Sequence, residues 1–321
     1  MDLSLEMEYT EEFNKLKSNF VRFITLEKGY KLEPVLPLNS RVDSTVFLIG
    51  SCTNVFKPYF LSNTIEGCGH ALIQPGINTK DIFFADINQS RRFYSTYTIL
   101  GLLQSVKNLP IILDDSYELI TKVVGLDSTK IRLRVNPKDT DFISYIEKKY
   151  QFFIGNENCG RHSFGKHNGI FIQGRHISFC YDNQNIAISC VYEYNGEALG
   201  VETSTTVQAL IAAKNGFQNT MEASVLNDKY VAKTPQEFNY YDCVSAIAEL
   251  MHSGVKPNSS HMPGRILKKY INRIAALEKE LRITSSYTTE LINFYIKASY
   301  PTEFVSSNVV LSQGQATCHQ R

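Results

Sequence analysis

Glu202 and Thr203 lie in a stretch where a predicted strand, residues 198–203, runs directly into a predicted helix. The helix begins at about residue 205, where apolar residues start to recur with helical spacing. Backbone N–H groups at the start of a helix attract anions and polar ligands. This junction of sheet edge and helix is therefore a candidate binding site.

The strand at this junction is predicted to be the second arm of a β-hairpin. Residues 186–194 are rich in strand-forming side chains, and Asn195-Gly196 follows them. Both turn residues tolerate the positive φ that a type I′ turn requires. Gly216 comes just after the apolar stripe and can end the helix in the left-handed conformation.

A second candidate is a basic helix face near the C-terminal end. Arg265, Lys268, Lys269 and Arg273 recur at helical spacing, which places them on one face. Such a face can follow the phosphate backbone of an RNA. The same pattern also fits a solvated face opposite three isoleucines, so both interpretations stay open.

Five cysteine and histidine residues could suggest a metal centre: Cys159, His162, His167, His176 and Cys180. The spacings C-x2-H and H-x3-C resemble ligand pairs. The last two residues lie in a strand pattern, which turns their side chains apart or separates them along the strand. We therefore predict no metal and interpret the segment as a histidine-rich loop over a pocket, with a histidine general base as the alternative.

Composition sets broad limits on function. The chain has 321 residues, of which 43% are hydrophobic and 20% charged, with a net charge of +1, so nucleic-acid binding would need a local patch. We find no apolar run of about 18 residues and no secretory signal, and predict no membrane association. An odd number of cysteines, 7, without framework spacing favours a reducing compartment, the cytoplasm. Walker A and dinucleotide-binding fingerprints are absent from the sequence.

The predicted elements give an α+β domain followed by an all-α module. Strands are expected at 46–50, 70–74, 93–103, 130–135, 170–180, 186–194 and 198–203. Helices are expected at 9–28 with Thr10 as cap, 54–61 ended by Pro58, 139–150, 205–215, 242–253 with Asp242 as cap, 263–282 and 288–299, and a loop at 155–169. We predict a first domain at 1–218, a linker at 219–240 and a helical module at 241–321.

Collinear segments of the chain resemble alanyl-tRNA synthetases, that is, their class II catalytic domain, an antiparallel sheet with flanking helices, and their helical tRNA-recognition module. The similar segments are residues 10–29, 43–57 (DSTVFLIGSCTNVFK), 70–81 (HALIQPGINTKD), 92–101 (RFYSTYTILG), 201–213 (VETSTTVQALIAA) and 253–273 (SGVKPNSSHMPGRILKKYINR). The resemblance implies that 70–101 holds the second class-defining motif and 201–213 the third.

The chain departs from the family at the two arginines that bind the phosphates of ATP. In the family, an arginine of the second motif holds the α-phosphate of ATP, and Gln74 stands at that place. An arginine of the third motif lies against the γ-phosphate, and Ala209 stands there, preceded by Ser204 and Thr206 in place of glycines. Loss of these two arginines removes electrostatic stabilisation of the reacting phosphates, by several kcal/mol for each arginine.

Some features of the family's substrate site are retained. Arg92 matches an arginine in the strand that faces the nucleotide, and Lys80 lies near the motif loop, although a lysine lacks the bidentate fork of arginine. The family uses an aspartate to bind the amino group of alanine, and Glu202, longer by one methylene, takes that place. The family's tryptophan beside the alanine side chain has no counterpart, because the chain contains no tryptophan.

The resemblance implies three alternative functions. In the first, the chain is a paralogue with impaired ATP activation that binds an amino-acid-like ligand, tRNA or both. In the second, it is a working ligase that uses ATP and Mg²⁺ to charge tRNA or a carrier. In the third, it is a non-catalytic accessory subunit, in a homodimer or with a partner protein. We favour the first because of Gln74 and Ala209.

Overall fold

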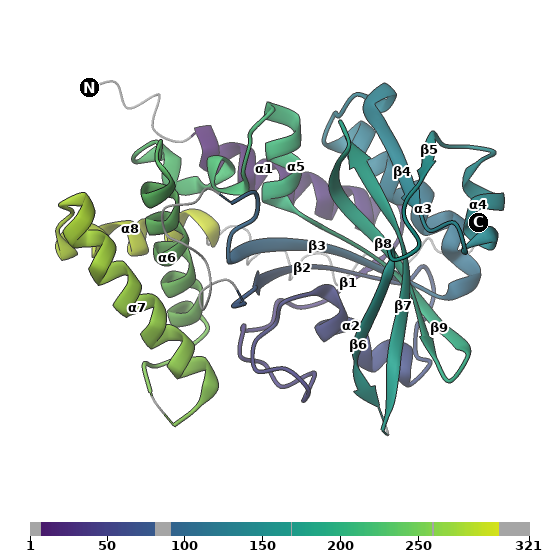
Figure 1. Cartoon of the computed structure of the whole chain (residues 1–321), viewed down its shortest axis with the longest axis horizontal. Coiled ribbons are helices and arrows are strands. Elements are labelled where there is room, and N and C mark those ends of the chain that lie inside the picture. The colour runs from purple at the N-terminus through teal and green to yellow at the C-terminus, as the bar shows by residue number, and fades with distance from the viewer. Residues whose placement is uncertain (1–7, 81–90, 168, 259, 302–321) are drawn as a thin grey trace.

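Within residues 8–80, 91–167, 169–258 and 260–301, which the computed structural model describes, nine strands form one mixed sheet (Figure 1). The strands are β1 (Lys31–Leu32), β2 (His70–Ile77), β3 (Thr96–Gln104), β4 (Ile131–Val135), β5 (Phe152–Ile154), β6 (Arg161–His167), β7 (Ile170–Tyr181), β8 (Gln184–Tyr194) and β9 (Glu197–Thr206). Their order is β1-β2-β3-β9-β8-β7-β4-β5, with β6 also paired to β7. Neighbours are antiparallel except β1 with β2 and β4 with β5. This order places the β2–β3 pair beside β9, about which the candidate site is built.

Helices flank the sheet and form a separate group at one end. They are α1 (Glu8–Arg22), α2 (Cys52–Leu61), α3 (Leu109–Glu118), α4 (Thr140–Ile146), α5 (Val207–Asn215), α6 (Pro235–His252), α7 (Met262–Leu281) and α8 (Ser285–Ser299). Figure 1 shows α1 and α5 on one side of β2 and β3, α2 on the other side, and α6, α7 and α8 together at the left. The predicted α+β class with a C-terminal helical region is confirmed. Among the described residues, no helix is long and apolar enough to cross a bilayer.

The hairpin and the junction that follows it form as the sequence predicts. Asn195 and Gly196 both have positive φ, 51° and 81°, as a type I′ turn requires. β9 then runs without interruption into α5, where the Thr206 hydroxyl accepts a hydrogen bond from the Ala209 N–H at 3.1 Å. Gly216 ends α5 with φ of 69°. Local signals therefore predict where β9 lies along the chain, whereas its place in the sheet depends on its pairing with β3 and β8.

The strand predicted at 46–50 is wrong, because these residues form bends and irregular loop after a turn at 44–45. The Asp43 carboxylate organises it by accepting hydrogen bonds from the Thr45 N–H at 3.0 Å and from the Lys57 ammonium at 3.1 Å. Side-chain bonds to nearby backbone groups compete with sheet ladders in this way. The loop predicted at 155–169 is also partly wrong, since residues 161–167 form β6, whose pattern is obscured by a bulge between Ser163 and Lys166.

Three helix ends differ from the predictions. The first amides of α1 bond the Asp228 carboxylate, from Tyr9 and Thr10 at 2.8 Å each, so the cap comes from a distant residue. Pro58 lies inside α2, which continues to Leu61. Helix α6 begins seven residues before Asp242, because Thr234 and Glu237 form a reciprocal capping box.

Residues 219–240, predicted as a linker, contain two short 3₁₀ helices, Thr220–Ala223 and Val225–Asp228, and the start of α6. Met221, Val225 and Leu226 are buried there. This stretch therefore packs against the rest of the chain along much of its length.

A buried polar contact joins the sheet to the C-terminal helices. The Asp242 carboxylate, inside α6, accepts hydrogen bonds from the N–H and the hydroxyl of Ser95 at 2.7 Å each. It also pairs with Arg91 at 3.1 Å. Buried charges are retained when they are paired and hydrogen-bonded in this way. The contact fixes the start of β3 relative to α6.

Candidate functional site

Glu202 lies at the centre of a row of residues that crosses the sheet on one face. Register pairs Glu202 of β9 with Leu103 of β3 on one side and with Cys190 of β8 on the other. Cys190 in turn pairs with His176 of β7. Directly opposed residues of antiparallel strands point to the same face. A carboxyl, a thiol and an imidazole therefore lie in line on three adjacent strands.

The Glu202 side chain is buried and only partly satisfied. The residue is 4% exposed, and its Oε2 atom has no hydrogen-bond partner among the residues that the structure describes. The hydroxyls of Thr53, in α2, and Tyr192, in β8, lie 2.6 Å from each other beside it. Burial raises the pKa of Glu202 to about 8, while hydrogen bonds from Tyr192 and Thr53 act in the opposite direction. A buried carboxyl without a counter-cation is stabilised by a bound cation such as an ammonium group.

Gln74 and Ala209, at the places of the family's two arginines, have structural contacts. Gln74 is 1% exposed, accepts the Leu36 N–H at 2.9 Å and donates to the Leu36 carbonyl at 2.7 Å. The side-chain amide of Gln74 thus joins the segment before α2 to β2. Ala209 lies in the first turn of α5, where its N–H is capped by Thr206. Neither side chain provides a positive charge on this face.

The two remaining cations, Arg92 and Lys80, precede β3 and follow β2 along the chain. Burial lowers the pKa of Arg92, whereas nearby Cys180 acts to raise it. The Arg92 guanidinium lies 5.2 Å from the centre of the Phe93 ring. Lys80 is exposed and immediately precedes residues 81–90, which lie outside the described part of the chain together with Asp81 of the motif loop.

His176 belongs to the site in a role that the sequence did not indicate. It is 5% exposed, and its ring stacks on His162 with centroids 4.6 Å apart. In the described part of the chain, its Nδ1 has no hydrogen-bond partner. Burial, followed by the charges of His162, Arg134 and Arg161, lowers the pKa of His176 to about 4. The imidazole is therefore neutral at physiological pH. Only the strand register, which the sequence does not reveal, brings it into line with Glu202.

Thr53, Tyr192, Arg134 and Ser178 were also missed by the sequence reasoning. Arg134 of β4 is paired in register with Ser178 of β7, and its Nη2 donates to the Ser178 hydroxyl at 3.3 Å. The alternation of residues 130–135 was a usable signal, since it predicts that Arg132 and Arg134 share one face.

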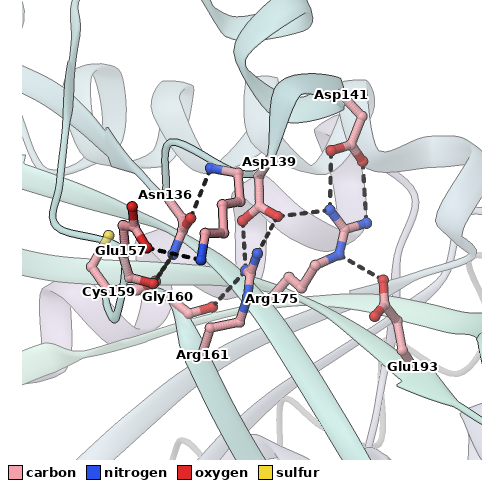
Figure 2. A network of polar contacts seen from close by, with 10 residues as sticks. Asn136, Asp139, Asp141, Glu157, Cys159, Gly160, Arg161, Arg175 and Glu193 are labelled. Carbon is pink, nitrogen blue, oxygen red and sulfur yellow. Dashed lines mark hydrogen bonds and ion pairs between the residues drawn. The ribbon is translucent and has the colours of Figure 1, made fainter.

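An ion-pair network holds the strands that carry His176 in place (Figure 2). Arg175 of β7 bonds Asp139 at 3.1 Å, Asp141 at 3.0 Å and Glu193 of β8 at 2.6 Å. Arg161 of β6 forms two further bonds of 2.6 Å to Asp139, which is almost fully buried. Bidentate arginine–carboxylate pairs restrict geometry strongly. The network thereby fixes β6, β7 and β8 beside α4.

The basic residues of α7 lie on its outer side. Arg265, Lys268 and Lys269 are exposed, whereas Arg273 is half-buried with an Nη2 3.5 Å from the Asn239 side-chain oxygen. The stripe that faces α6 and the interior is instead apolar, with Ile266, Leu267, Tyr270, Ile274 and Leu277 buried. Three of the four predicted RNA-binding side chains therefore share an accessible surface.

A surface groove of about 570 Å³ lies away from these residues, between α1, α5 and residues 123–124. Glutamates 8, 11 and 12 and lysines 15 and 214 line part of it. None of the predicted site residues borders this groove, so it adds nothing to the site around Glu202.

Comparisons with known proteins give partial likenesses of fold. No family model and no curated protein matches the chain. Similar solved structures include PylSc, a pyrrolysyl tRNA synthetase of Desulfitobacterium hafniense, at 10% identity and TM-score 0.41, over 65% of this chain and 71% of that chain. The aspartyl tRNA synthetase of Entamoeba histolytica is similar at 9% identity and TM-score 0.45, over 68% of this chain and 57% of that chain. The asparaginyl-tRNA synthetase of the same organism, in complex with asparaginyl-adenylate, is similar at 8% identity and TM-score 0.45, over 68% of this chain and 66% of that chain. At these TM-scores the likenesses carry no argument about the ligand or activity of this chain.

Proposed function

We propose that this chain is an alanyl-tRNA synthetase-like protein that binds an amino-acid-like ligand through Glu202 and has impaired ATP activation. The observation that carries the proposal is the buried, unpartnered Oε2 of Glu202 on β9. Because burial raises the pKa of this carboxyl to about 8, it is mostly protonated near neutral pH, and an incoming α-ammonium group stabilises the carboxylate that forms when this proton is lost. Glu202 also lies in the segment that resembles the family's third class-defining motif, at the place of the aspartate that binds the amino group of alanine, and this resemblance supports the same role.

Impaired activation follows from the electrostatics of the nucleotide side. Adenylate formation requires positive charge against the phosphates of ATP. Gln74 is engaged with Leu36, and Ala209 has no polar side chain. Arg92 and Lys80 are the cations that we expect to contact a nucleotide and its Mg²⁺ if activation is retained. We propose that they provide too little stabilisation for turnover.

Binding of tRNA is the second part of this proposal. The exposed positions of Arg265, Lys268 and Lys269 on α7 support it, as does the resemblance of residues 253–273 to the recognition module. An exposed basic helix face provides contacts to phosphates without reading base sequence.

The test of ligand binding is thermal stabilisation of the full chain by L-amino acids, compared between wild type and Glu202→Gln. A ligand that binds only the folded state raises the unfolding temperature. We expect at least one amino acid to stabilise the wild type and none to stabilise Glu202→Gln. Glu66→Gln, at an exposed glutamate, is the matched control and should respond as wild type. Equal stabilisation of wild type and Glu202→Gln would exclude the proposed role.

A further inference from the structure

We propose that the ligand is an amino acid whose side chain ends in a carboxylate or a primary amide, and that His176 and Arg134 select it. This inference rests on the proposed function, because it takes Glu202 as the site of the α-ammonium group. It adds the substrate class and the two side chains that determine specificity.

Two buried polar atoms on the same face of the sheet lack a partner. Within the described ranges of the chain, Oε2 of Glu202 and Nδ1 of His176 both lack a hydrogen bond, and the two residues are 4% and 5% exposed. Leaving a buried polar atom unpaired is unfavourable, so two such atoms in one row indicate a group that satisfies both when bound. The two residues lie two strands apart, with Cys190 between them in register.

The distance between these two positions excludes alanine as the bridging ligand. Neighbouring strands are about 4.8 Å apart, so the backbones at Glu202 and His176 are separated by roughly 10 Å. A methyl side chain on an amino acid held at Glu202 leaves Nδ1 of His176 unpaired. A longer side chain with a polar end reaches across Cys190 to the imidazole.

The charges around His176 decide which polar end fits. The guanidinium groups of Arg134 and Arg161 both act on the imidazole. Arg161 is paired with Asp139, whereas Arg134 bonds only the Ser178 hydroxyl and, among the described residues, has no carboxylate partner. An oxygen of a ligand carboxylate or amide is attracted to Arg134, while an ammonium end is repelled. The two ends of the site thus have opposite charge preferences.

The experiment is isothermal titration calorimetry of the full chain with L-glutamate, L-glutamine, L-aspartate, L-asparagine, L-alanine and L-lysine. We expect one of the carboxylate or amide amino acids to bind about tenfold or more tightly than alanine, because a site built for a polar group rejects ligands that lack it. We expect lysine to bind no better than alanine. Comparing the affinity of each acid with that of its amide shows whether the site recognises the oxygen of a carboxylate or that of an amide.

Variants assign the selection to particular residues. Arg134→Met and His176→Asn should abolish the preference over alanine. Arg22→Met at the end of α1 and His252→Asn at the end of α6, both exposed and outside the row, are matched controls that should keep the preference. Circular dichroism checks folding, and because Arg134 is only half-buried, its variant tests the inference even where His176→Asn does not fold.

Two results would overturn the inference in different ways. Equal affinity for all six amino acids, or tightest binding of lysine or alanine, contradicts the selection by His176 and Arg134 while the role of Glu202 stands. If none of the six amino acids binds to the wild type or to the variants that keep Glu202, the proposed function is contradicted as well. N-acetylation of the preferred amino acid removes its positive charge and should abolish binding to the wild type.

Discussion

Glu202 carries the functional argument at the scale of single residues. Sequence predicted its position from the junction of strand and helix, but not its burial or the absence of a partner for Oε2. The neighbours that define its environment, Thr53 and Tyr192, come from α2 and β8. The two replaced phosphate-binding arginines show the same difference between what the sequence reveals and what the structure reveals. Their loss is visible in the sequence, whereas the engagement of Gln74 with Leu36 is visible only in the structure.

The stability of the protein should depend on pH through Glu202. The pKa of this carboxyl is about 8 in the folded chain, above its ordinary value of 4.5. The protonated folded form therefore contributes stability that is complete below the ordinary value and is lost as pH rises through 8. We expect Glu202→Gln to match wild type at about pH 4 and to be more stable at about pH 8, by ~4 kcal/mol at 1.4 kcal/mol per pKa unit.

Urea unfolding of both proteins at several pH values measures this difference. Glu66→Gln serves as the control, and its offset from wild type should stay constant with pH. A pH-independent difference between wild type and Glu202→Gln would show that the carboxyl does not titrate between these values.

Elements that depend on local chemistry were predictable, and those that depend on distant partners were not. The Asn195-Gly196 turn, β9, α5 and its end at Gly216 follow from propensity, turn type and capping. Failures occurred at 46–50, beside which Asp43 binds the more distant Lys57, and at α1, where Asp228 provides the cap. In both cases a tertiary contact outweighs the local pattern, and the row from Glu202 to His176 depends on strand register in the same way.

Helix α7 is the element on which the RNA proposal depends. We expect Lys268→Ala with Lys269→Ala to weaken tRNA binding and to reduce the salt slope of log K by about 0.9 for each phosphate that the variant no longer neutralises. Fluorescence anisotropy with labelled tRNA across a salt series measures both quantities. Lys107→Ala with Lys148→Ala, at exposed lysines outside α7, is the control of equal charge change. An unchanged slope in the α7 variant, or the same change in the control, would favour the solvated-face interpretation.

At the scale of the whole molecule, the sheet and the C-terminal helices are joined through Asp242, Ser95 and Arg91. A further buried contact connects α1 to α8, since the Lys17 ammonium donates to the Ser299 carbonyl at 2.7 Å. These contacts place the basic surface of α7 and the row around Glu202 in one structure. The surface proposed to bind RNA and the row proposed to bind an amino-acid-like ligand therefore belong to one packed structure.

The central claim is that ligand binding is retained while ATP activation is impaired. The most direct measurement is amino-acid-dependent exchange of pyrophosphate into ATP with Mg²⁺, scanned over all proteinogenic amino acids, including those that bind in calorimetry. We predict no exchange above the level without amino acid, because the places of both phosphate-binding arginines hold Gln74 and Ala209. Exchange stimulated by one amino acid would contradict this account and show that Arg92 and Lys80 suffice for activation.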